Sequence, residues 1–383
     1  MSWKHLFSEA LAAAPARLHL AAHSHHLWPD ATRAAQLQAW EDGVTLADHK
    51  WDKVFGEVMP AAQAGIAAEL KLPSPDSLAF APNTHEFIVR LVSGRARRPV
   101  RILSTDGEFH SFRRQSARWA ESDEVVLETI ATDPWDSFAD RFIERAQSGE
   151  HDLIFASHVF FKTGRVFERV AELASLSRPD GPWLMIDGYH GFMAMPTDLS
   201  AIADRAFYTA GGYKYAMAGE GAAFLHVPPG FGLRPANTGW FAEFEDLTAP
   251  PGTIGYAPGG GRFLGATFDP SGLYRLAAVF DLYRREGLTT EAVAAHSAGL
   301  QRHLLDGLSG ALAEAELLNP LDGRAHARYL AFKDARAPEW KKALDAEGVV
   351  TDVRDDVLRI GFGPYQDESD IDRFLGIAGK ALA

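Results

Sequence analysis

Short apolar runs recur through the middle of the chain at a length that suits buried strands. Seven runs rich in Val, Ile, Leu, Phe and Ala fit this description: "SLAFAP", "VRILST", "EVVLETI", "DLIFASHVF", "PWLMIDGYH", "DRAFYTAGG" and "GAAFLHV". Helix-like segments lie between several of them, namely "THEFIVRLVSG", "HSFRRQSARWAESD", "DSFADRFIERAQSG" and "VFERVAELASLSR". This alternation predicts an α/β fold with a mostly parallel, seven-stranded sheet that is covered by helices on both faces.

The strand–helix alternation does not continue in the C-terminal part of the chain. Residues 228–270 are rich in Gly and Pro, which predicts long loops that leave the sheet, and two helical patterns follow at about 272–286 and 289–315. The chain then reads as strand, helix, strand, strand and helix, which predicts a small α+β domain that the N-terminal segment also joins. The predicted parts are an N-terminal segment covering the site (1–50), a large domain (51–270), connecting helices (271–315) and a small C-terminal domain (316–383).

Composition and charge narrow the possible partners. The 383 residues are 46% hydrophobic, which is enough for a large buried core. The formal net charge is −13, whereas nucleic-acid binding needs a basic stripe. The stretch "RARRPVR" from Arg95 to Arg101 is short and fits a solvated loop. We therefore expect a small-molecule substrate and no nucleic-acid partner.

The chain has no cysteine, which excludes disulfides, thiol nucleophiles and thiolate zinc sites. Its N-terminal stretch "MSWKHLFSEALAAAPARLHL" is amphipathic, and polar residues interrupt it too often for a signal peptide. No apolar run approaches the roughly 20 residues that a membrane-spanning helix needs. We therefore expect a soluble, cytoplasmic protein without a membrane partner.

The stretch "LHLAAHSHHLWPD" places His23, His25 and His26 behind a short apolar run. Histidines at the end of a strand can form a metal site of the amidohydrolase kind, with later ligands from "ASHVFF" and "IDGYH". That fold would need eight strand–helix units, and the C-terminal residues do not continue that rhythm. We therefore expect no metal, and the role of the three histidines stays open at this point.

Two other stretches carry a chemical signal together. Asp187 ends the apolar run in "WLMIDGYHGF", and Lys214 stands between two tyrosines in "AGGYKYAMAGEG". Burial of an ammonium among aromatic residues is costly, so it lowers the pKa of the amine, and a neutral amine can form a Schiff base. A carboxylate at a strand end upstream of such a lysine fits a cofactor with a cationic ring nitrogen, as in pyridoxal 5'-phosphate.

These motifs resemble the class V aminotransferase superfamily of pyridoxal-phosphate-dependent enzymes, which has fold type I. "IDGYH" and "GGYKYAMAGEG" are most similar to the D-x-x-H and S-Y-K-Y-L-N-A-G-x-G motifs of kynureninases. The resemblance covers most of the chain, because further segments follow in the same order: "APNTHEFIVRLVSG", "GEFHSF", "TGWF" and "LRIGFGPY". The motif around Lys214 is specific, whereas the other segments support the resemblance mainly because they follow in the right order.

The resemblance implies roles around the cofactor ring. Lys214 would form the Schiff base and move the protons of the substrate, and Asp187 would pair with the pyridinium nitrogen. His190 would hydrogen-bond near the ring, the alternative being a structural histidine. Phe109 would stack on the ring, the alternative being an ordinary core aromatic residue.

The resemblance also implies a phosphate site at the start of a helix. Unpaired N–H groups and the helix dipole at Thr84 and His85 would favour the anion. Tyr213 and Trp240 would donate to the phosphate from their hydroxyl and indole groups. Thr267 would reach it from a neighbouring subunit, since the resemblance implies a homodimer.

At the substrate end the chain departs from the family. Arg359 in "LRIGFGPY" would bind the α-carboxylate of an amino-acid substrate. The family motif G-N-S-L-G is "AHSHH" here, which keeps Ser24 and replaces Asn with His23, and the Asp after the stacking Phe is Phe112. His49 falls near the position of a kynureninase histidine that contacts the aromatic substrate. These differences place the histidine cluster on the substrate side.

The resemblance predicts a kynureninase-like hydrolase that cleaves the Cβ–Cγ bond of an amino acid such as kynurenine. An aminotransferase or another pyridoxal-phosphate-dependent lyase on the same scaffold is the alternative, since the superfamily contains all of these. A catalytically inactive regulator that only binds the cofactor is a further alternative, but no DNA-binding arm is attached. A desulfurase that stores sulfur on its own cysteine is excluded, because the chain has none.

Overall fold

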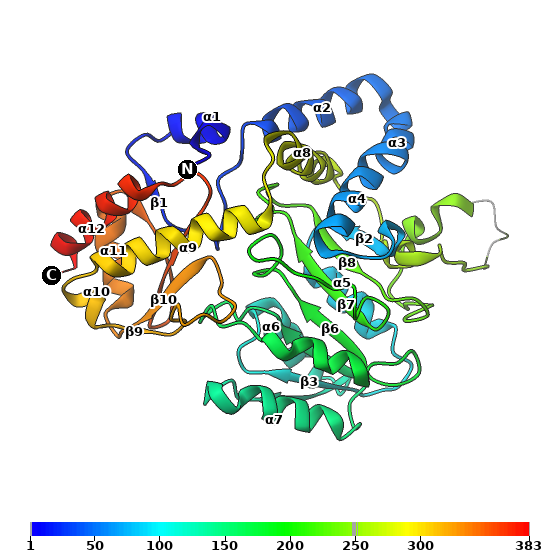
Figure 1. Ribbon diagram of the computed structural model, residues 1–383. Helices are drawn as coiled ribbons and strands as arrows, with labels where there is room; N and C mark the ends of the chain where they lie inside the picture. The colour runs from blue at the N-terminus through cyan, green and yellow to red at the C-terminus, as the bar shows by residue number, and fades with distance from the viewer. Residues whose placement is uncertain (1, 247–249, 251, 383) are drawn as a thin grey trace.

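A seven-stranded sheet forms the centre of the protein in a computed structural model that describes residues 2–246, 250 and 252–382 (Figure 1). The strand order is β2-β8-β7-β6-β5-β3-β4. The pairs from β7 to β4 are parallel, and β8 runs antiparallel to both β7 and β2. This confirms the predicted mostly parallel sheet. Its strands are β2 (Leu78–Ala81), β3 (Val100–Thr105), β4 (Val125–Ile130), β5 (Leu153–Ser157), β6 (Trp183–Asp187), β7 (Ala206–Gly211) and β8 (Ala223–His226).

Both faces of the sheet are buried by helices, because successive strand residues point to opposite faces. In β6, Leu184 and Ile186 join one core cluster, whereas Trp183 and Met185 join another. The first cluster includes side chains from α4, α7 and α8, and the second includes side chains from α5 and α6. These helices are α4 (Met59–Leu70), α5 (Thr84–Ser93), α6 (His110–Ala120), α7 (Trp135–Gln147) and α8 (Ser271–Glu286).

The helices before the sheet were not predicted from the hydrophobic pattern. α2 (Ala31–Leu46) lies along α8, and its outer face carries the exposed side chains of Leu37, Trp40 and Val44. Apolar residues on a solvent-facing side weaken the amphipathic signal that marks a helix in a sequence. The remaining short elements of this region are η1 (Lys4–Phe7), α1 (Ser8–Ala12), η2 (Ala47–His49), α3 (Lys50–Lys53), a π-helical turn η3 (Val54–Val58) and η4 (Pro75–Ser77).

A four-stranded antiparallel sheet, in the order β12-β13-β10-β9, forms the second part of the molecule. Its helices pack on it through a separate apolar core (Figure 1). The N-terminal residues lie against this part, where β1 pairs in parallel with β11. The exact domain bounds stay a prediction. The elements are β1 (Leu18–His19), α9 (Thr290–Gly307), α10 (Ala311–Glu314), β9 (Glu316–Leu317), β10 (Tyr329–Lys333), α11 (Ala337–Ala346), β11 (Val349–Val350), β12 (Asp352–Arg354), β13 (Val357–Gly361) and α12 (Glu368–Ala381).

Two predicted helices differ in the structure. The segment "VFERVAELASLSR" forms a 3-10 helix, η5 (Glu168–Leu176), and the helix predicted over 289–315 is broken between α9 and α10. The break falls at Gly310, whose φ of 63° is left-handed and does not continue a helix. Within the loop region predicted over 228–270, η6 (Trp240–Asp246) and η7 (Gly259–Phe263) are short 3-10 turns.

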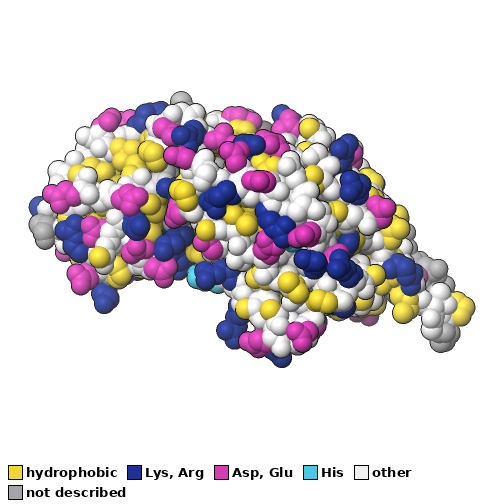
Figure 2. Space-filling model, turned by 90° about the horizontal axis from the view of Figure 1, so that it is seen from below, with side chains coloured by type: hydrophobic (Ala, Val, Ile, Leu, Met, Phe, Trp, Pro, Cys, Tyr) yellow, Lys and Arg dark blue, Asp and Glu magenta, His cyan; other side chains and the backbone are white. Residues whose placement is uncertain are grey.

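The surface is of mixed charge. On the face that Figure 2 shows, Lys and Arg side chains alternate with Asp and Glu. Among the helices in the described part of the chain, none is long and apolar enough to cross a membrane.

Candidate active site

The candidate site lies at the edge of the central sheet where its parallel strands end. β6 ends at Asp187, and its parallel neighbour β7 ends at Gly211, shortly before Lys214. β5 pairs with β6 on the other side and ends at Ser157. Because parallel strands end at one edge of a sheet, the carboxylate, the amine and the hydroxyl are placed on neighbouring loops.

The Lys214 amine is enclosed by aromatic rings. Its Nζ lies 4.2 Å from the ring centre of Tyr189, 4.8 Å from that of Tyr213 and 5.5 Å from that of Phe109. Only 5% of Lys214 is exposed. This burial lowers the pKa of the amine to about 7, although the Asp187 carboxylate opposes the shift. A large fraction of the amine is therefore neutral near pH 7 and can act as a nucleophile.

Asp187 is held by the turn that follows β6. Its Oδ1 accepts the backbone N–H of Tyr189 at 2.9 Å. Burial raises the pKa of Asp187, while that hydrogen bond and the Lys214 charge oppose the rise. The two loops approach closely because position 211 is glycine: a Cβ there would lie 2.3 Å from the Tyr189 hydroxyl. The carboxylate and the amine thus favour each other's charged form.

Two more of the predicted ring-side residues lie beside this pair. Phe109 precedes the first residue of α6, and its ring packs edge-on against Phe161 with ring centres 5.3 Å apart. His190 lies in the turn after β6 and is 6% exposed. Its Nδ1 is buried and has no hydrogen-bond partner among the described residues. Burial lowers the pKa of His190 well below its ordinary value, so the ring is neutral and one nitrogen is unused.

A buried carboxyl that the sequence analysis did not predict lies directly before Phe109. Glu108 is fully buried and accepts the hydroxyl of Thr105 at 2.8 Å and the hydroxyl of Ser157 at 2.5 Å. Its Oε1 also accepts the Ser157 backbone N–H at 3.2 Å. Burial raises the pKa of Glu108 to about 8, and the Asp187 charge adds to the rise. The signal in the sequence was an acidic residue between an apolar strand and an aromatic residue in "GEFHSF".

Two replacements of Glu108 separate the effect of its ionisation on stability from the effect of its hydrogen bonds. The folded-state pKa is raised, so the folded state binds more protons than the unfolded state, and stability falls as pH rises from about 4.5 to about 8. Glu108→Gln is expected to flatten that part of the stability curve. Glu108→Ala is expected to lower the free energy of unfolding by about 2 kcal/mol, because two hydroxyls lose their acceptor. Denaturant unfolding at several pH values measures both, and an unchanged pH dependence in the glutamine variant would contradict the argument.

The N-terminal histidines fold over the loop that carries Lys214. The ring of His25 stacks on Tyr213 with centres 5.2 Å apart, and the His26 backbone N–H donates to the Tyr213 carbonyl at 3.2 Å. His23 is fully buried and stacks on Tyr329 with centres 4.6 Å apart. Three histidines that point to different partners do not form a metal site, and no group of three potential ligands occurs in residues 2–246, 250 and 252–382.

His23 and Ser24 differ in their surroundings. Burial lowers the pKa of His23 well below its ordinary value, and the charges of Arg359 and Lys214 lower it further. Both ring nitrogens of His23 are buried, and neither has a partner in the part of the chain described. Ser24 is partly exposed and its hydroxyl lies 3.5 Å from His25 Nδ1. The structure therefore brings His23 to the site as a neutral ring with unused nitrogens.

Arg359 lies on β13 and is buried beside the site. Its Nε donates to Asp352 Oδ1 at 2.9 Å, its Nη2 donates to the same oxygen, and its Nη1 donates to the Phe161 carbonyl at 2.5 Å. Arg354 also pairs with Asp352, at 3.0 Å. Asp352 thus fixes the guanidinium at the boundary of the two parts of the molecule. Three of the five N–H groups of Arg359 are used, and two are left for a ligand.

The predicted phosphate site opens α5. Asn83 precedes the helix in extended conformation, and its side-chain oxygen accepts the Glu86 backbone N–H at 3.2 Å. Thr84 and His85 form the first turn, where N–H groups have no partner within the helix. The Nδ1 of His85 is buried without a described partner, and His85 borders a hollow of about 1230 Å³ that also reaches His110 next to Phe109.

Three predicted site residues make their contacts elsewhere on the same chain. Trp240 and Thr267 are exposed and contact each other, with Trp240 Nε1 donating to the Thr267 hydroxyl at 3.0 Å. His49 has 87% of its side chain exposed and lies 3.3 Å from Asp52. Within one chain, the structure does not bring these side chains into described contact with Lys214.

Comparison with known proteins shows which family model and which curated relative the chain is similar to. Residues 293–377 match the kynureninase C-terminal domain. Isopenicillin N epimerase of Streptomyces clavuligerus is 31% identical over 196 residues, which span 48% of this chain and 48% of the epimerase. The chain therefore spans about half the length of that curated relative. These partial matches support the resemblance to the class V aminotransferase superfamily of pyridoxal-phosphate-dependent enzymes.

Solved structures of low sequence identity share the fold of this chain. A C-DES mutant with glycine covalently linked to its PLP cofactor has a TM-score of 0.83 at 17% identity, over 99% of this chain and 100% of that chain. The cysteine desulfurase CsdA from Escherichia coli has a TM-score of 0.82 at 16% identity, over 99% and 97% of the two chains. An apo cysteine desulfurase from Thermococcus onnurineus NA1 gives 0.80 at 17%, over 98% and 97%. These confirm fold type I.

Proposed function

We propose that this class V enzyme holds pyridoxal 5'-phosphate at Lys214 and cleaves the Cβ–Cγ bond of an amino acid by hydrolysis, as a kynureninase-like enzyme. The observation that carries the proposal is the buried, partly neutral Lys214 amine beside Asp187. The match to the kynureninase C-terminal domain includes Arg359 and supports the choice of reaction.

Unused buried polar atoms fit the cofactor. Lys214 supplies the amine, and Asp187 supplies a carboxylate for the ring nitrogen. The first turn of α5 at Thr84 and His85 offers N–H groups for the phosphate. His190 keeps an unpartnered buried nitrogen among the described contacts. When bound, the cofactor supplies an electron sink for a carbanion at the substrate Cα.

The side chains of this protein bind the substrate and move its protons. The neutral Lys214 amine takes the proton from the substrate Cα and returns a proton to the alanine product. Asp187 keeps a proton on the ring nitrogen, and Arg359 binds the α-carboxylate through its two remaining N–H groups. Water adds to the γ-carbonyl carbon, the Cβ–Cγ bond breaks, and alanine and a carboxylic acid leave. His23, neutral and facing the site, is placed to hydrogen-bond the substrate side chain.

A homodimer accounts for the predicted residues that lie on the surface. Trp240, Thr267 and His49 are exposed, as expected if they reach the site of a second copy. The outer face of α2 carries exposed apolar residues at positions 37, 40 and 44, a spacing that places them on one side of the helix. Such a stripe is typical of an interface. We propose that two copies assemble through this side.

The experiment that tests the reaction is a substrate assay. Purified enzyme with L-kynurenine or 3-hydroxykynurenine is expected to release anthranilate or its hydroxylated form together with alanine, with the Lys214→Ala protein as the blank. Amino-group transfer to pyruvate or 2-oxoglutarate without anthranilate would instead support an aminotransferase. Because one relative is an epimerase, inversion at the substrate Cα is a third possible outcome. Chiral chromatography measures it, and inversion without cleavage would contradict the proposed hydrolysis.

A further inference from the structure

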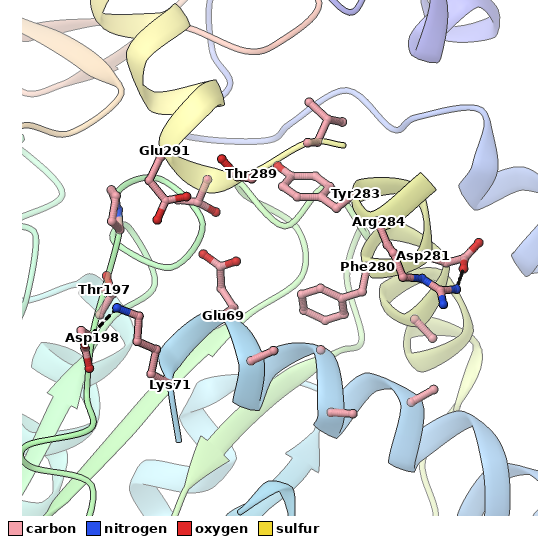
Figure 3. A pocket seen from close by; sticks show the side chains of 18 residues that line it. Glu69, Lys71, Thr197, Asp198, Phe280, Asp281, Tyr283, Arg284, Thr289 and Glu291 are labelled. Atoms are coloured by element: carbon pink, nitrogen blue, oxygen red, sulfur yellow. Dashed lines mark hydrogen bonds and ion pairs between the residues drawn. The ribbon is translucent and has the colours of Figure 1, made fainter. Parts of the chain in front are cut away.

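A second pocket lies apart from Lys214, between α4, α8 and the start of α9 (Figure 3). Its volume is about 730 Å³, a size that suits a small organic molecule. The apolar part of its wall is made of alanines from α4 and α8 together with Phe280. Phe280 lies directly over Gly65, where a Cβ would be 2.2 Å from its ring. The pocket thus has a smooth apolar wall built by two packed helices.

The side chains that line the pocket carry more negative than positive charge. It is lined by four carboxylates and two cations: Glu69, Asp198, Asp281, Glu291, Lys71 and Arg284. Both cations are already paired, Lys71 with Asp198 at 2.9 Å and Arg284 with Asp281. Glu69 and Glu291 form no ion pair with any described residue, so two negative charges face the pocket without compensation.

The helix dipole favours the negative charge of one of these two unpaired carboxylates and disfavours that of the other. Glu291 stands in the first turn of α9, where the helix dipole stabilises a negative charge. Glu69 stands in the last turn of α4, where the dipole opposes one. Burial raises the pKa of Glu69, and the charge of Glu291 raises it further. The Thr290 side chain opposes that rise. No cation among the described residues pairs with the Glu69 carboxylate, so a cationic ligand would supply the missing partner.

An independent observation points into the same pocket. Tyr283 lines it and is 6% exposed, and its hydroxyl is buried with no hydrogen-bond partner among the described residues. Figure 3 shows Tyr283 and Glu69 on opposite sides of the space, with the Glu69 carboxylate pointing into it. The nearby buried cation Arg328 does not line the pocket, and it donates to the carbonyls of Met193 and Phe362. The inner end therefore offers a carboxylate and a hydroxyl.

We propose that this pocket binds an organic ammonium ion, whose N–H donates to the Glu69 carboxylate, whose positive charge lies beside the Tyr283 hydroxyl oxygen, and whose apolar body packs against Phe280 and the alanines. A metal ion is disfavoured because no group of three potential ligands occurs in the described part of the chain. The ammonium charge adds a cation–ring attraction at the Phe280 and Tyr283 side chains. An aromatic body can also pack ring against ring there. This site is independent of the reaction proposed above.

The test uses N,N-dimethylbenzylammonium, a tertiary ammonium that keeps one N–H and cannot form a Schiff base with a cofactor aldehyde. Isothermal titration of the holoenzyme is expected to show saturable binding. Glu69→Gln is expected to weaken that binding at least about tenfold, as for loss of one charged hydrogen bond, and Tyr283→Phe to weaken it less. Glu57→Gln, an exposed change outside the pocket, is the matched control and is expected to leave the affinity unchanged.

Stability separates loss of the ligand site from loss of the fold. Glu69→Gln removes a carboxylate from the unfavourable end of α4 and is expected to leave the melting temperature of the free protein equal or higher. Binding of the probe that is absent in the wild-type protein, or equal in the wild-type and Glu69→Gln proteins, would overturn the proposal. Preferential binding of benzoate, which has a similar body and the opposite charge, would overturn it as well.

Discussion

Replacing Lys214 with alanine is expected to abolish turnover, with a loss of at least about 10³-fold, because one side chain holds the cofactor and moves the substrate proton. The expected spectrum lacks the visible absorbance of a lysine-linked pyridoxal phosphate, even when cofactor is added in excess. The wild-type amine is buried and its pKa is lowered to about 7. Capture of the cofactor by the cofactor-free wild-type protein should therefore accelerate as pH rises through about 7, where the amine loses its proton.

Lys380→Ala is the matched control, since it removes an exposed lysine of α12. Its spectrum and turnover should equal those of the wild-type protein. The Lys214→Ala protein is also expected to be no less stable than the wild-type protein without cofactor, because burying an ammonium costs free energy that alanine avoids. A lysine-linked cofactor spectrum in the alanine variant, recorded without free amino acids, would show that another lysine holds the cofactor and would contradict the placement of the site.

Much of the fold follows from patterns that are local in the sequence. The runs that form β3, β6 and β7 are short, mostly apolar and buried along nearly their whole length, which is how strands buried on both faces appear. The reversed direction of β8 was not predictable, because an antiparallel strand between two neighbours near the edge of such a sheet has the same apolar run. The helices over 31–70 escaped prediction because exposed apolar residues such as Trp40 blur their periodicity.

The site was predictable only in part, for a related reason. Asp187 and Lys214 follow neighbouring parallel strands, so the topology alone brings them together. Glu108 was missed because its meaning depends on Ser157, which arrives from another strand. The pairing of Arg359 with Asp352 likewise depends on the register of β12 with β13, which sets the two residues opposite each other. A sequence shows which groups follow strands, but not which groups become partners.

Asp187→Asn is expected to lower turnover by about 10² to 10³-fold while the cofactor remains bound. An amide cannot keep the ring nitrogen protonated, so the ring would withdraw electrons less well from the substrate Cα. Lys214 and the first turn of α5 are unchanged, so the visible absorbance and the stoichiometry of bound cofactor should persist. Loss of turnover with retained cofactor distinguishes this residue from Lys214, whose removal takes both away.

The stability of the cofactor-free protein shows whether the loss reflects damage to the fold. Burial raises the pKa of Asp187, so the folded state loses stability as pH rises and the carboxyl ionises. The asparagine variant removes that cost and keeps the oxygen that accepts the Tyr189 N–H, so above neutral pH its melting temperature should equal or exceed that of the wild-type protein. Asp204→Asn, at an exposed position before β7, is the control for the same chemical change. Wild-type turnover in Asp187→Asn would mean that a different group faces the ring nitrogen, because a neutral amide cannot replace the charge that the proposed chemistry requires.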